Sequence, residues 1–591
     1  MNSRILSKAS TSPLGTSLVG DSCEFRVWAP AAKTVTLRLI NEQGTHDWPM
    51  QYAGDQLFSL QAFVQPGDRY FYIVDQHKPV PDPVSRLLPE GVHGPTEIVD
   101  PKKFAWNDIN WRGLPLRDYV IYELHTGTFT PEGTFDAAIS RLPYLKKLGV
   151  TVIEIMPVAA FPGTRNWGYD GVSPYAVQAS YGGPDALKRL VNAAHEIGLG
   201  VILDVVYNHL GNEGNYLRFF GPYFTSRHQT PWGEAINYDQ PGCEGVRRYF
   251  AENALYWVRE YHMDGLRLDA VQTIKDDSPK HILAEIAEDV AALAAELGRK
   301  VCVIAETDEN DEKLARPAKT GGFGLDAIWS DDFHHAVHAF FTGERKGYYQ
   351  DFGRPEQIVR TLQDGFVYQG EPFQFWGGRP RGTSSTSMPA TAHVICIQNH
   401  DQVGNRANGE RLAEIVPRGA RMLAAALLLL APEIPLLFMG QEYDEPNPFQ
   451  FFTDYGDPTL QKAVREGRQQ EFKDFDFSGD SVPDPQDPAT FNRSKLNWNL
   501  TEGENLMLEW YTSLLALRRK YITGAERTCK ADLRDGVIHM QLPREEPALK
   551  VFARIQGSAA LPELGVGWEK ALAMEEDGLA VSVWVECLDT R

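Results

Sequence analysis

Residues 187–206, LKRLVNAAHEIGLGVILDVV, contain the change of pattern that decides the fold. The first half has apolar residues at helical spacing, which is how an amphipathic helix packs on a core; they are Leu187, Leu190, Val191, Ala194 and Ile197. Gly198 follows them and favours the end of that helix. Residues 200–206 are an apolar run of strand length. We therefore expect a helix that leads directly into a buried strand.

The same alternation of strand-like and helical segments continues through most of the chain, as parallel β/α units require. Eight apolar runs of strand length can be recognised, at residues 119–124, 150–155, 200–206, 265–268, 301–305, 325–330, 392–398 and 435–439. Eight such units predict an α/β fold, a (β/α)8 TIM barrel with several long loop insertions, over residues 107–522. A doubly wound parallel sheet is the alternative.

At both ends of the chain, apolar residues recur at every second position instead. Near the start, Phe25 and Val27 alternate with polar residues, and later segments repeat the pattern. This predicts an Ig-like β-sandwich over residues 1–106, which ends in a proline-rich stretch. Near the other end, Leu549, Val551 and Ala553 begin a similar alternation. We expect an antiparallel β-domain over residues 523–591.

The composition excludes some classes of partner. The 591 residues include 58 Lys and Arg and 79 Asp and Glu, which gives a net charge of −21. A negative protein is repelled by nucleic-acid phosphates and by an anionic membrane surface. Residues 1–20 hold no apolar run of the secretory type, so we expect a cytoplasmic protein. Pro432, Glu433 and Pro435 interrupt the apolar residues 422–440, which predicts a buried helix, a turn and a strand in place of a membrane span.

Polar residues follow directly after four of the eight runs. The third leads into DVVYNH (204–209), the fourth into RLD (267–269), the fifth into Glu306 and the seventh into NHD (399–401). One isolated carboxylate at such a position most often caps the next helix. Four polar strand ends in one barrel favour an active site, because active sites of barrels lie where the carboxyl ends of the strands meet.

The spacing of these carboxylates points to glycoside chemistry. A retaining glycosidase needs two carboxyl groups about 5 to 5.5 Å apart, and Asp269 and Glu306 end successive strands, which lie about 4.8 Å apart in a sheet. Arg267 shares a strand face with Asp269 and can hold it ionised. Apolar neighbours can raise the pKa of Glu306 until it acts as an acid. Asp401 adds a third carboxylate.

The strings DVVYNH, GLRLD, IAET and NHD, in this order, are similar to the four signature regions of the α-amylase family of glycoside hydrolases and transglycosylases. The resemblance implies Asp269 as nucleophile, Glu306 as general acid/base and Asp401 as transition-state stabiliser. It implies that Arg267 orients the nucleophile, that His209 and His400 contact the sugar, and that Tyr169 is the family's stacking aromatic residue. With Asp204, these residues form the expected substrate-binding set. We add Asp332 to this set; further candidates are Asp331, His335, Trp167 and Trp232.

Longer strings make the chain most similar to the members of this family that release trehalose. They are FRVWAP from Phe25, YELHTGTF from Tyr122, NWGYDGV from Asn166, WSDDFHH from Trp329 and NHDQVGNR from Asn399. This resemblance implies a maltooligosaccharide with a terminal trehalose unit as substrate and hydrolysis of the α-1,4 bond next to that unit. It also implies a partner enzyme, a synthase that makes the terminal trehalose linkage.

Two alternatives remain open. A glucan branching transglycosylase uses the same carboxylates, although its seventh-strand motif usually lacks the residue found here as Asn399. A non-catalytic glycan-binding protein typically lacks at least one of the three carboxylates. No cofactor is expected. No metal is predicted either, because the six cysteines lack metal-type spacing and no calcium partners for Asn208 can be identified.

Overall fold

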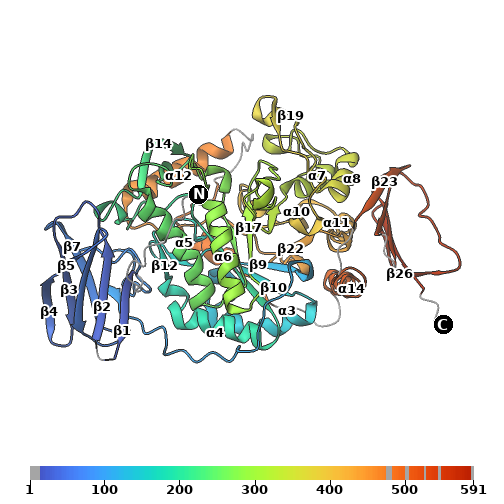
Figure 1. Cartoon of the computed structure of the whole chain (residues 1–591). Helices are drawn as coiled ribbons and strands as arrows, with labels where there is room; N and C mark the ends of the chain where they lie inside the picture. Colours follow the sequence, from blue (N-terminus) through green and yellow to red (C-terminus); the bar gives the residue numbers. More distant parts are fainter. Residues whose placement is uncertain are drawn as a thin grey trace.

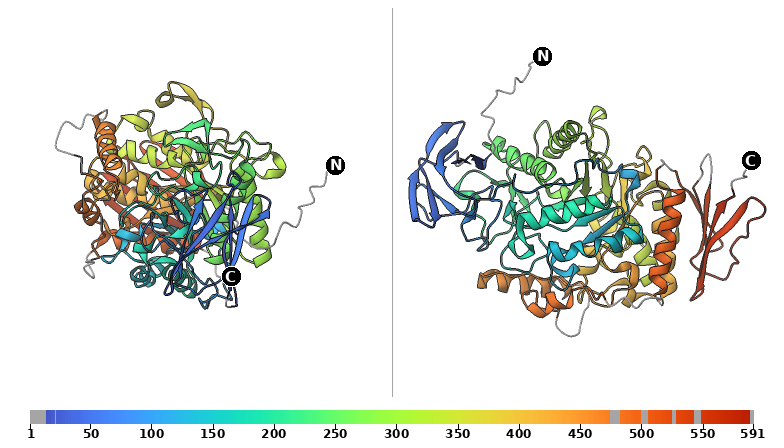
Figure 2. Two further views of the ribbon diagram at one scale, coloured as in Figure 1. Left: turned by 90° about the vertical axis from the view of Figure 1, so that its left-hand side faces the viewer. Right: turned by 90° about the horizontal axis from the view of Figure 1, so that it is seen from below.

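The computed structural model describes residues 14–20, 22–473, 482–498, 505–524, 528–542 and 548–587. Of residues 1–20, on which the expectation about a signal segment rests, residues 1–13 lie outside these ranges. The chain forms three consecutive blocks, with β-sheets at either end and a barrel between them (Figure 1). A view from below shows the same separation, with the first and last sheets on opposite sides of the barrel (Figure 2).

The central block is a closed barrel of eight parallel strands in the order β10-β13-β16-β17-β18-β21-β22-β9. The strands are β9 (Ile121–Leu124), β10 (Val152–Ile155), β13 (Gly200–Val205), β16 (Gly265–Leu268), β17 (Cys302–Glu306), β18 (Ala327–Trp329), β21 (His393–Cys396) and β22 (Ile434–Phe438). Each one falls on one of the eight predicted runs. The predicted TIM barrel is confirmed, and the doubly wound sheet is excluded because the sheet closes on itself.

Helices cover the outside of the barrel. The longer ones are α3 (Leu142–Leu148), α4 (Gly183–Glu196), α5 (Cys243–Glu260), α6 (Ile282–Leu297), α7 (Asp331–Thr342), α8 (Pro355–Asp364), α11 (Arg418–Leu430) and α14 (Leu506–Tyr521). The predicted helix before β13 is α4, and Gly198 has a φ of 75°, the left-handed conformation that ends a helix and favours glycine. The helix-to-strand reading of residues 187–206 is therefore confirmed.

The apolar stretch at residues 422–440 also folds as predicted. It forms most of α11, a turn and β22, and Leu427 to Leu430 are fully buried. Across the described ranges, no helix has both the length and the apolar character that crossing a membrane requires.

The loops between the barrel strands, and for α12 and α13 the segment between β22 and α14, carry the remaining elements. The strands are β11 (Ala159–Ala160), β12 (Ser173–Val177), β14 (Phe224–Thr230), β15 (Gly233–Ile236), β19 (Glu371–Phe373) and β20 (Arg379–Arg381). The helices are α1 (Thr126–Phe129), α2 (Phe135–Ile139), α9 (His400–Gly404), α10 (Leu412–Ile415), α12 (Pro458–Lys473) and α13 (Pro488–Arg493).

The first block consists of two four-stranded sheets, in the orders β1-β2-β6-β5 and β4-β3-β7-β8. Their strands are β1 (Gly15–Val19), β2 (Ser22–Trp28), β3 (Val35–Asn41), β4 (Gly44–Pro49), β5 (Gln51–Gly54), β6 (Leu57–Phe63), β7 (Arg69–Val74) and β8 (Thr96–Glu97). Phe25 of one sheet packs edge-on against Tyr70 of the other, with ring centroids 5.0 Å apart. The predicted N-terminal β-sandwich is confirmed.

The last block is one antiparallel sheet in the order β23-β24-β25-β27-β26. Its strands are β23 (Lys530–Arg534), β24 (Val537–Leu542), β25 (Leu549–Arg554), β26 (Trp568–Glu576) and β27 (Leu579–Glu586). An ion pair of 2.7 Å between Arg418 of α11 and Glu576 of β26 joins this sheet to the barrel. The predicted C-terminal β-domain is confirmed.

Candidate active site

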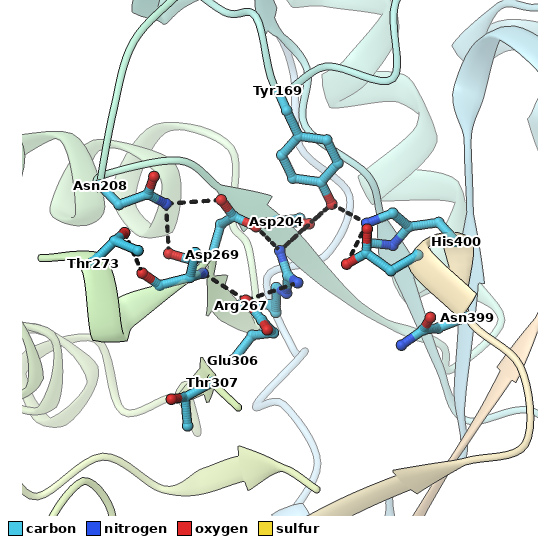
Figure 3. A network of polar contacts seen from close by, with 12 residues as sticks. Tyr169, Asp204, Asn208, Arg267, Asp269, Thr273, Glu306, Thr307, Asn399 and His400 are labelled. Atoms are coloured by element: carbon cyan, nitrogen blue, oxygen red, sulfur yellow. Dashed lines mark hydrogen bonds and ion pairs between the residues drawn. The ribbon is translucent and has the colours of Figure 1, made fainter. Parts of the chain in front are cut away.

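The polar strand ends predicted from the sequence meet at the carboxyl end of the barrel (Figure 3). Asp204 lies in β13, Arg267 in β16 and Glu306 at the end of β17. Asp269 follows β16 directly, and His400 begins the short helix α9 after β21. Five residues from four segments that are far apart in the chain therefore contribute to one cluster.

Arg267 is the centre of this cluster. Its side chain is fully buried, and its Nη1 atom lies 2.8 Å from both Asp204 Oδ2 and Asp269 Oδ1. Its Nη2 atom lies 3.5 Å from Glu306 Oε2. The guanidinium also lies over the ring of Trp329, 4.4 Å from its centroid. One cation thus holds three carboxyl groups in a fixed arrangement.

Asp269 is held through both carboxylate oxygens. Arg267 binds Oδ1, and the side-chain amide of Asn208 donates to Oδ2 at 2.7 Å. The same amide donates to the backbone oxygen of Asp269, also at 2.7 Å. The side chain is 11% exposed, so it is oriented by the protein but open at one side. This is the arrangement that an attacking carboxylate needs.

Glu306 is held in surroundings that favour its protonated form. Burial raises the pKa of Glu306 to about 8, although the nearby Arg267 lowers it. Its Oε2 atom accepts a 2.6 Å hydrogen bond from the backbone N–H of Ala270, whose φ of 40° is left-handed. At neutral pH the carboxyl group therefore carries a proton that it can donate.

Tyr169 and His400 continue the network away from Asp204. The Tyr169 hydroxyl donates to Asp204 Oδ2 at 2.6 Å and lies 2.8 Å from His400 Nε2. His400 Nδ1 lies 2.5 Å from Glu123 Oε1. Against the effect of burial, Asp401 and Glu123 raise the pKa of His400 to about 9, so both ring nitrogens donate. Asp401 is 41% exposed, with a carboxylate oxygen 3.4 Å from His400 Nε2.

His209 and two tryptophans occupy different environments. His209 binds the side chain of Asn208 and lies 2.9 Å from the backbone oxygen of Tyr169. Trp232, which is 46% exposed, stacks on His209 with ring centroids 4.0 Å apart. Trp167 is buried and donates to the backbone oxygen of Gln450 at 2.9 Å. Only Trp232 of this pair presents an open aromatic face.

The structure does not bring Asp332 to the cluster. Its carboxylate is fully buried and accepts hydrogen bonds from Arg381 (2.5 Å), Asn310 (2.8 Å) and the backbone N–H of Val367 (2.6 Å). Both oxygens are therefore used inside the protein. The neighbouring Asp331 interacts electrostatically with the cluster instead. Burial and, next, the charge of Asp401 raise the pKa of Asp331 to about 7. His335 is buried against the rings of Tyr348 and Phe352.

Comparison with known proteins agrees with this geometry. Residues 99–229 match the family described as alpha amylase, catalytic domain, and residues 13–93 match carbohydrate-binding module 48, the isoamylase N-terminal domain. The chain is 49% identical over 513 residues to the malto-oligosyltrehalose trehalohydrolase of Saccharolobus solfataricus, which covers 87% of this chain and 88% of the relative. The chain belongs to the malto-oligosyltrehalose trehalohydrolase family.

Two further proteins are similar to this chain over nearly its whole length. The malto-oligosyltrehalose trehalohydrolase of Arthrobacter ramosus is 46% identical over 553 residues, 92% of this chain and 94% of the relative. The crystal structure of a Salmonella typhimurium protein described as an alpha amylase superposes with a TM-score of 0.89 at 42% identity. That comparison covers 97% of this chain and 99% of the other.

Sequence reasoning missed three groups in this member of the malto-oligosyltrehalose trehalohydrolase family. Asn208 was considered only as a metal ligand, but its amide holds Asp269. Glu123 ends the first barrel strand and accepts from the backbone N–H of His400 at 2.9 Å. The N–H of Ala270 binds Glu306. Glu123 could have been found from the sequence, because it is a carboxylate near the end of a predicted strand. The backbone N–H of Ala270 could not, because every residue except proline has a backbone N–H.

One group of side chains in the described ranges has the geometry of a metal site. His228, Asp239 and Asp277 have ligand atoms within 4.8 Å of one another. Asp239 already accepts from the side chain of Gln240 at 2.6 Å and from the backbone N–H of Asp277 at 3.1 Å. Because these protein donors bind both of its oxygens, we assign no metal to this group of side chains.

Proposed function

We propose that the protein hydrolyses the α-1,4-glucosidic bond next to the terminal trehalose of maltooligosyltrehalose, with retention of configuration, and releases trehalose. The activity is that of a 4-α-D-(1,4-α-D-glucano)trehalose trehalohydrolase. The observation that carries the proposal is that Arg267 holds both the carboxylate of Asp269 and Glu306, whose pKa is raised to about 8, in a chain 49% identical to an enzyme of this name. An oriented carboxylate beside a protonated one is the requirement of a retaining glycosidase.

In the first step Asp269 attacks the anomeric carbon of the glucose before the scissile bond. The carbon–oxygen bond to trehalose breaks, and the leaving oxygen takes the proton of Glu306. In the second step a water molecule gives a proton to Glu306 and its hydroxide to the anomeric carbon, which releases Asp269. Asp401 stabilises the positive charge that develops on the sugar ring in both steps.

The surrounding side chains are proposed to bind the sugar ring. They are Tyr169, Asp204, His209, Arg267 and His400. We propose Asp331 in place of Asp332, because the carboxylate of Asp332 is buried among protein donors. Asn405 donates to Asp401 at 3.2 Å and also lines a cavity of about 500 Å³, a volume in the range of ligand sites. This cavity leaves room for sugar units beyond the cleaved bond.

Product analysis on a defined substrate tests the proposal. Incubation with maltotriosyltrehalose should yield maltotriose and trehalose, with the new reducing end formed first as the α-anomer. Incubation with amylose should yield no α-1,6 branches. Branches in amylose would favour the glucan branching transglycosylase, and binding without any product would favour a non-catalytic glycan-binding protein. The variant Glu306→Gln serves as the negative control.

The remaining expectations belong to the same proposal. We propose the division into residues 1–106, 107–522 and 523–591, and it is supported because the sandwich, barrel and C-terminal sheets each fall inside one range. We also propose that the enzyme acts in the cytoplasm, in trehalose biosynthesis, on the product of a maltooligosyltrehalose synthase. Trehalose release from the mixed product of such a synthase, and fractionation of the host cell, test these points.

A further inference from the structure

A second polar layer lies inside the barrel, beside and below the groups described above. Glu154 of β10 pairs in register with Glu123 of β9 and with Ile202 of β13. Asp204 lies two residues after Ile202 in β13, at the next inward-facing position of that strand, and it pairs in register with Arg267 of β16. Inward side chains of neighbouring barrel strands form adjacent layers. Glu154 therefore points into the same interior as the Asp204–Arg267 pair.

Glu154 is a buried carboxyl group that the proposed reaction does not use. Its exposed fraction is 1%, and neither of its oxygens has a hydrogen-bond partner within the part of the chain that the structure describes. Burial raises its pKa well above the usual range. The charged and titratable groups that act on it, or on which it acts, are Glu123, Asp204, Arg267, Cys302, Cys396 and His400. Glu154 is thus a neutral acid with one O–H donor and a free acceptor.

Three atoms of its neighbours are in the same situation. Oδ1 of Asp204 and both Nε and Nη2 of Arg267 are buried and have no hydrogen-bond partner among the described residues, although Nη2 lies 3.5 Å from Glu306 Oε2. Asp204, Arg267 and Glu154 come from β13, β16 and β10, which are consecutive in the barrel. Buried polar groups are almost always hydrogen-bonded, directly or through internal water.

We propose that Glu154 is a positioning residue, which as a neutral carboxyl group binds Asp204 and Arg267 through shared internal water and so aligns the guanidinium with Asp269. The inference rests on the proposed hydrolase function. One such water accepts from the O–H of Glu154 and donates to Oδ1 of Asp204, and another accepts from Nε of Arg267 and donates to the carbonyl oxygen of Glu154. Without this support the guanidinium is free to tilt away from Asp269.

Replacing Glu154 by glutamine and by leucine separates this role from simple packing. Glutamine is uncharged and keeps one donor and one acceptor, so E154Q should keep kcat within about threefold and leave the pH profile of kcat/KM unchanged. Leucine keeps the approximate volume but removes both hydrogen-bonding functions. E154L should lower kcat by about 10- to 100-fold with KM within about twofold, because transition-state alignment is lost while sugar contacts remain.

The controls distinguish failure of this inference from failure of the proposed function. If the unmodified enzyme releases no trehalose, the proposed function fails. If it does and E154L keeps kcat within threefold, the positioning role is wrong. The positioning role would also be overturned if E154Q lost as much activity as E154L, or if E154Q had a shifted pH profile. Either result would mean that Glu154 acts as a charged group. E154M replaces E154L if the latter does not fold. E433L, which removes a buried carboxyl group at the other end of the barrel, should leave kcat unchanged.

Discussion

The two ends of the barrel each hold a buried cluster of charged side chains, and the clusters differ in how completely their atoms are paired. At the amino end, Asp264 lies directly before β16 and accepts from His195 at 2.9 Å, Trp111 at 2.7 Å and Arg299 at 3.0 Å. His195 also binds Asp108 at 2.8 Å. Both oxygens of Asp264 and both nitrogens of His195 have partners.

The carboxyl-end cluster uses similar residues but leaves several groups unpaired or shifted. Nε of Arg267 and Oδ1 of Asp204 lack partners among the described residues, and burial raises the pKa of Glu306 to about 8. Carboxylate oxygens that all have partners stabilise a fold, whereas a carboxyl group with a raised pKa can donate a proton. The comparison teaches that charge and burial are common to both ends, and that the pairing of the carboxylate oxygens separates the stabilising cluster from the reactive one.

The largest effect is expected from Glu306→Gln, which removes the proton donor. Trehalose release should fall by about 10² to 10⁴-fold, the range for loss of a general acid. In the unmodified enzyme kcat/KM should fall above about pH 8, because Glu306 then loses its proton. A pH profile of kcat/KM from pH 5 to pH 10 checks this, and a decline that begins near pH 5 would contradict the assignment.

Glu433 provides a matched control for Glu306. Burial raises its pKa to about 8 as well, but it lies before β22, at the amino end. Glu433→Gln should leave kcat within about twofold of the unmodified enzyme. A large loss of kcat in this variant would show that a raised pKa at either end affects activity, and the contrast between the ends would fail.

The next effect concerns the stability of the amino-end cluster. Asp108→Asn leaves His195 and His262 without their shared carboxylate. Removing one partner of a buried ion pair should lower the free energy of unfolding by about 3 kcal/mol. Because the change is far from the carboxyl-end cluster, kcat should be unchanged. Thermal unfolding and activity at one temperature, measured together, check both parts.

The pH dependence of this loss follows from the two groups. Against burial, hydrogen bonds to Asp108 and Asp264 raise the pKa of His195, so its stabilisation is complete below about pH 6.5 and is lost as the pH rises through the higher folded value. Hydrogen bonds from His195 and His262 lower the pKa of Asp108, so its stabilisation is lost only in strong acid. The Asp108→Asn variant should therefore be less destabilised at pH 9 than at pH 6.

A smaller loss of activity is expected when the support of Asp269 is weakened. Asn208→Ala removes one of the two side-chain donors to that carboxylate. A hydrogen bond to a charged group contributes about 1.5 to 3 kcal/mol, so kcat should fall by about 10- to 100-fold. Asn237→Ala is the control, because that buried amide donates to the backbone oxygen of Pro222. Equal losses of kcat in the two variants would argue against a role of Asn208 in orienting Asp269.

The smallest effect is expected from Trp111→Phe, which removes one donor from Asp264 and keeps most of the ring that stacks on His195. The free energy of unfolding should fall by about 1 to 2 kcal/mol, since an ionised acceptor loses one of several donors. Urea unfolding measures this change, and kcat should not move. A change in kcat without a change in stability would reverse the roles assigned to the two ends.

Periodicity predicted the elements, and strand order predicted which of their ends meet. The eight apolar runs became the eight strands of the barrel, because a strand buried on both faces must be apolar along its length. Arg267 and Asp269 were expected on one face from their spacing of two, and one hydrogen bond of 2.8 Å joins them. Asp332 was placed in the substrate-binding set because it follows β18, but Asp331 and Asp332 point in different directions from the start of α7.

The sequence by itself determined the class of each segment and the set of carboxylates at the strand ends, because these depend on local patterns of apolar and polar residues. The closure of the sheet into a barrel was decided by the tertiary structure. Only the tertiary structure decided which of those groups are paired. Asn208 holds Asp269, Glu123 holds His400, and Glu154 has no hydrogen-bond partner among the described residues. The Glu123–His400 contact joins residues 277 positions apart, so no local pattern of the chain contains it.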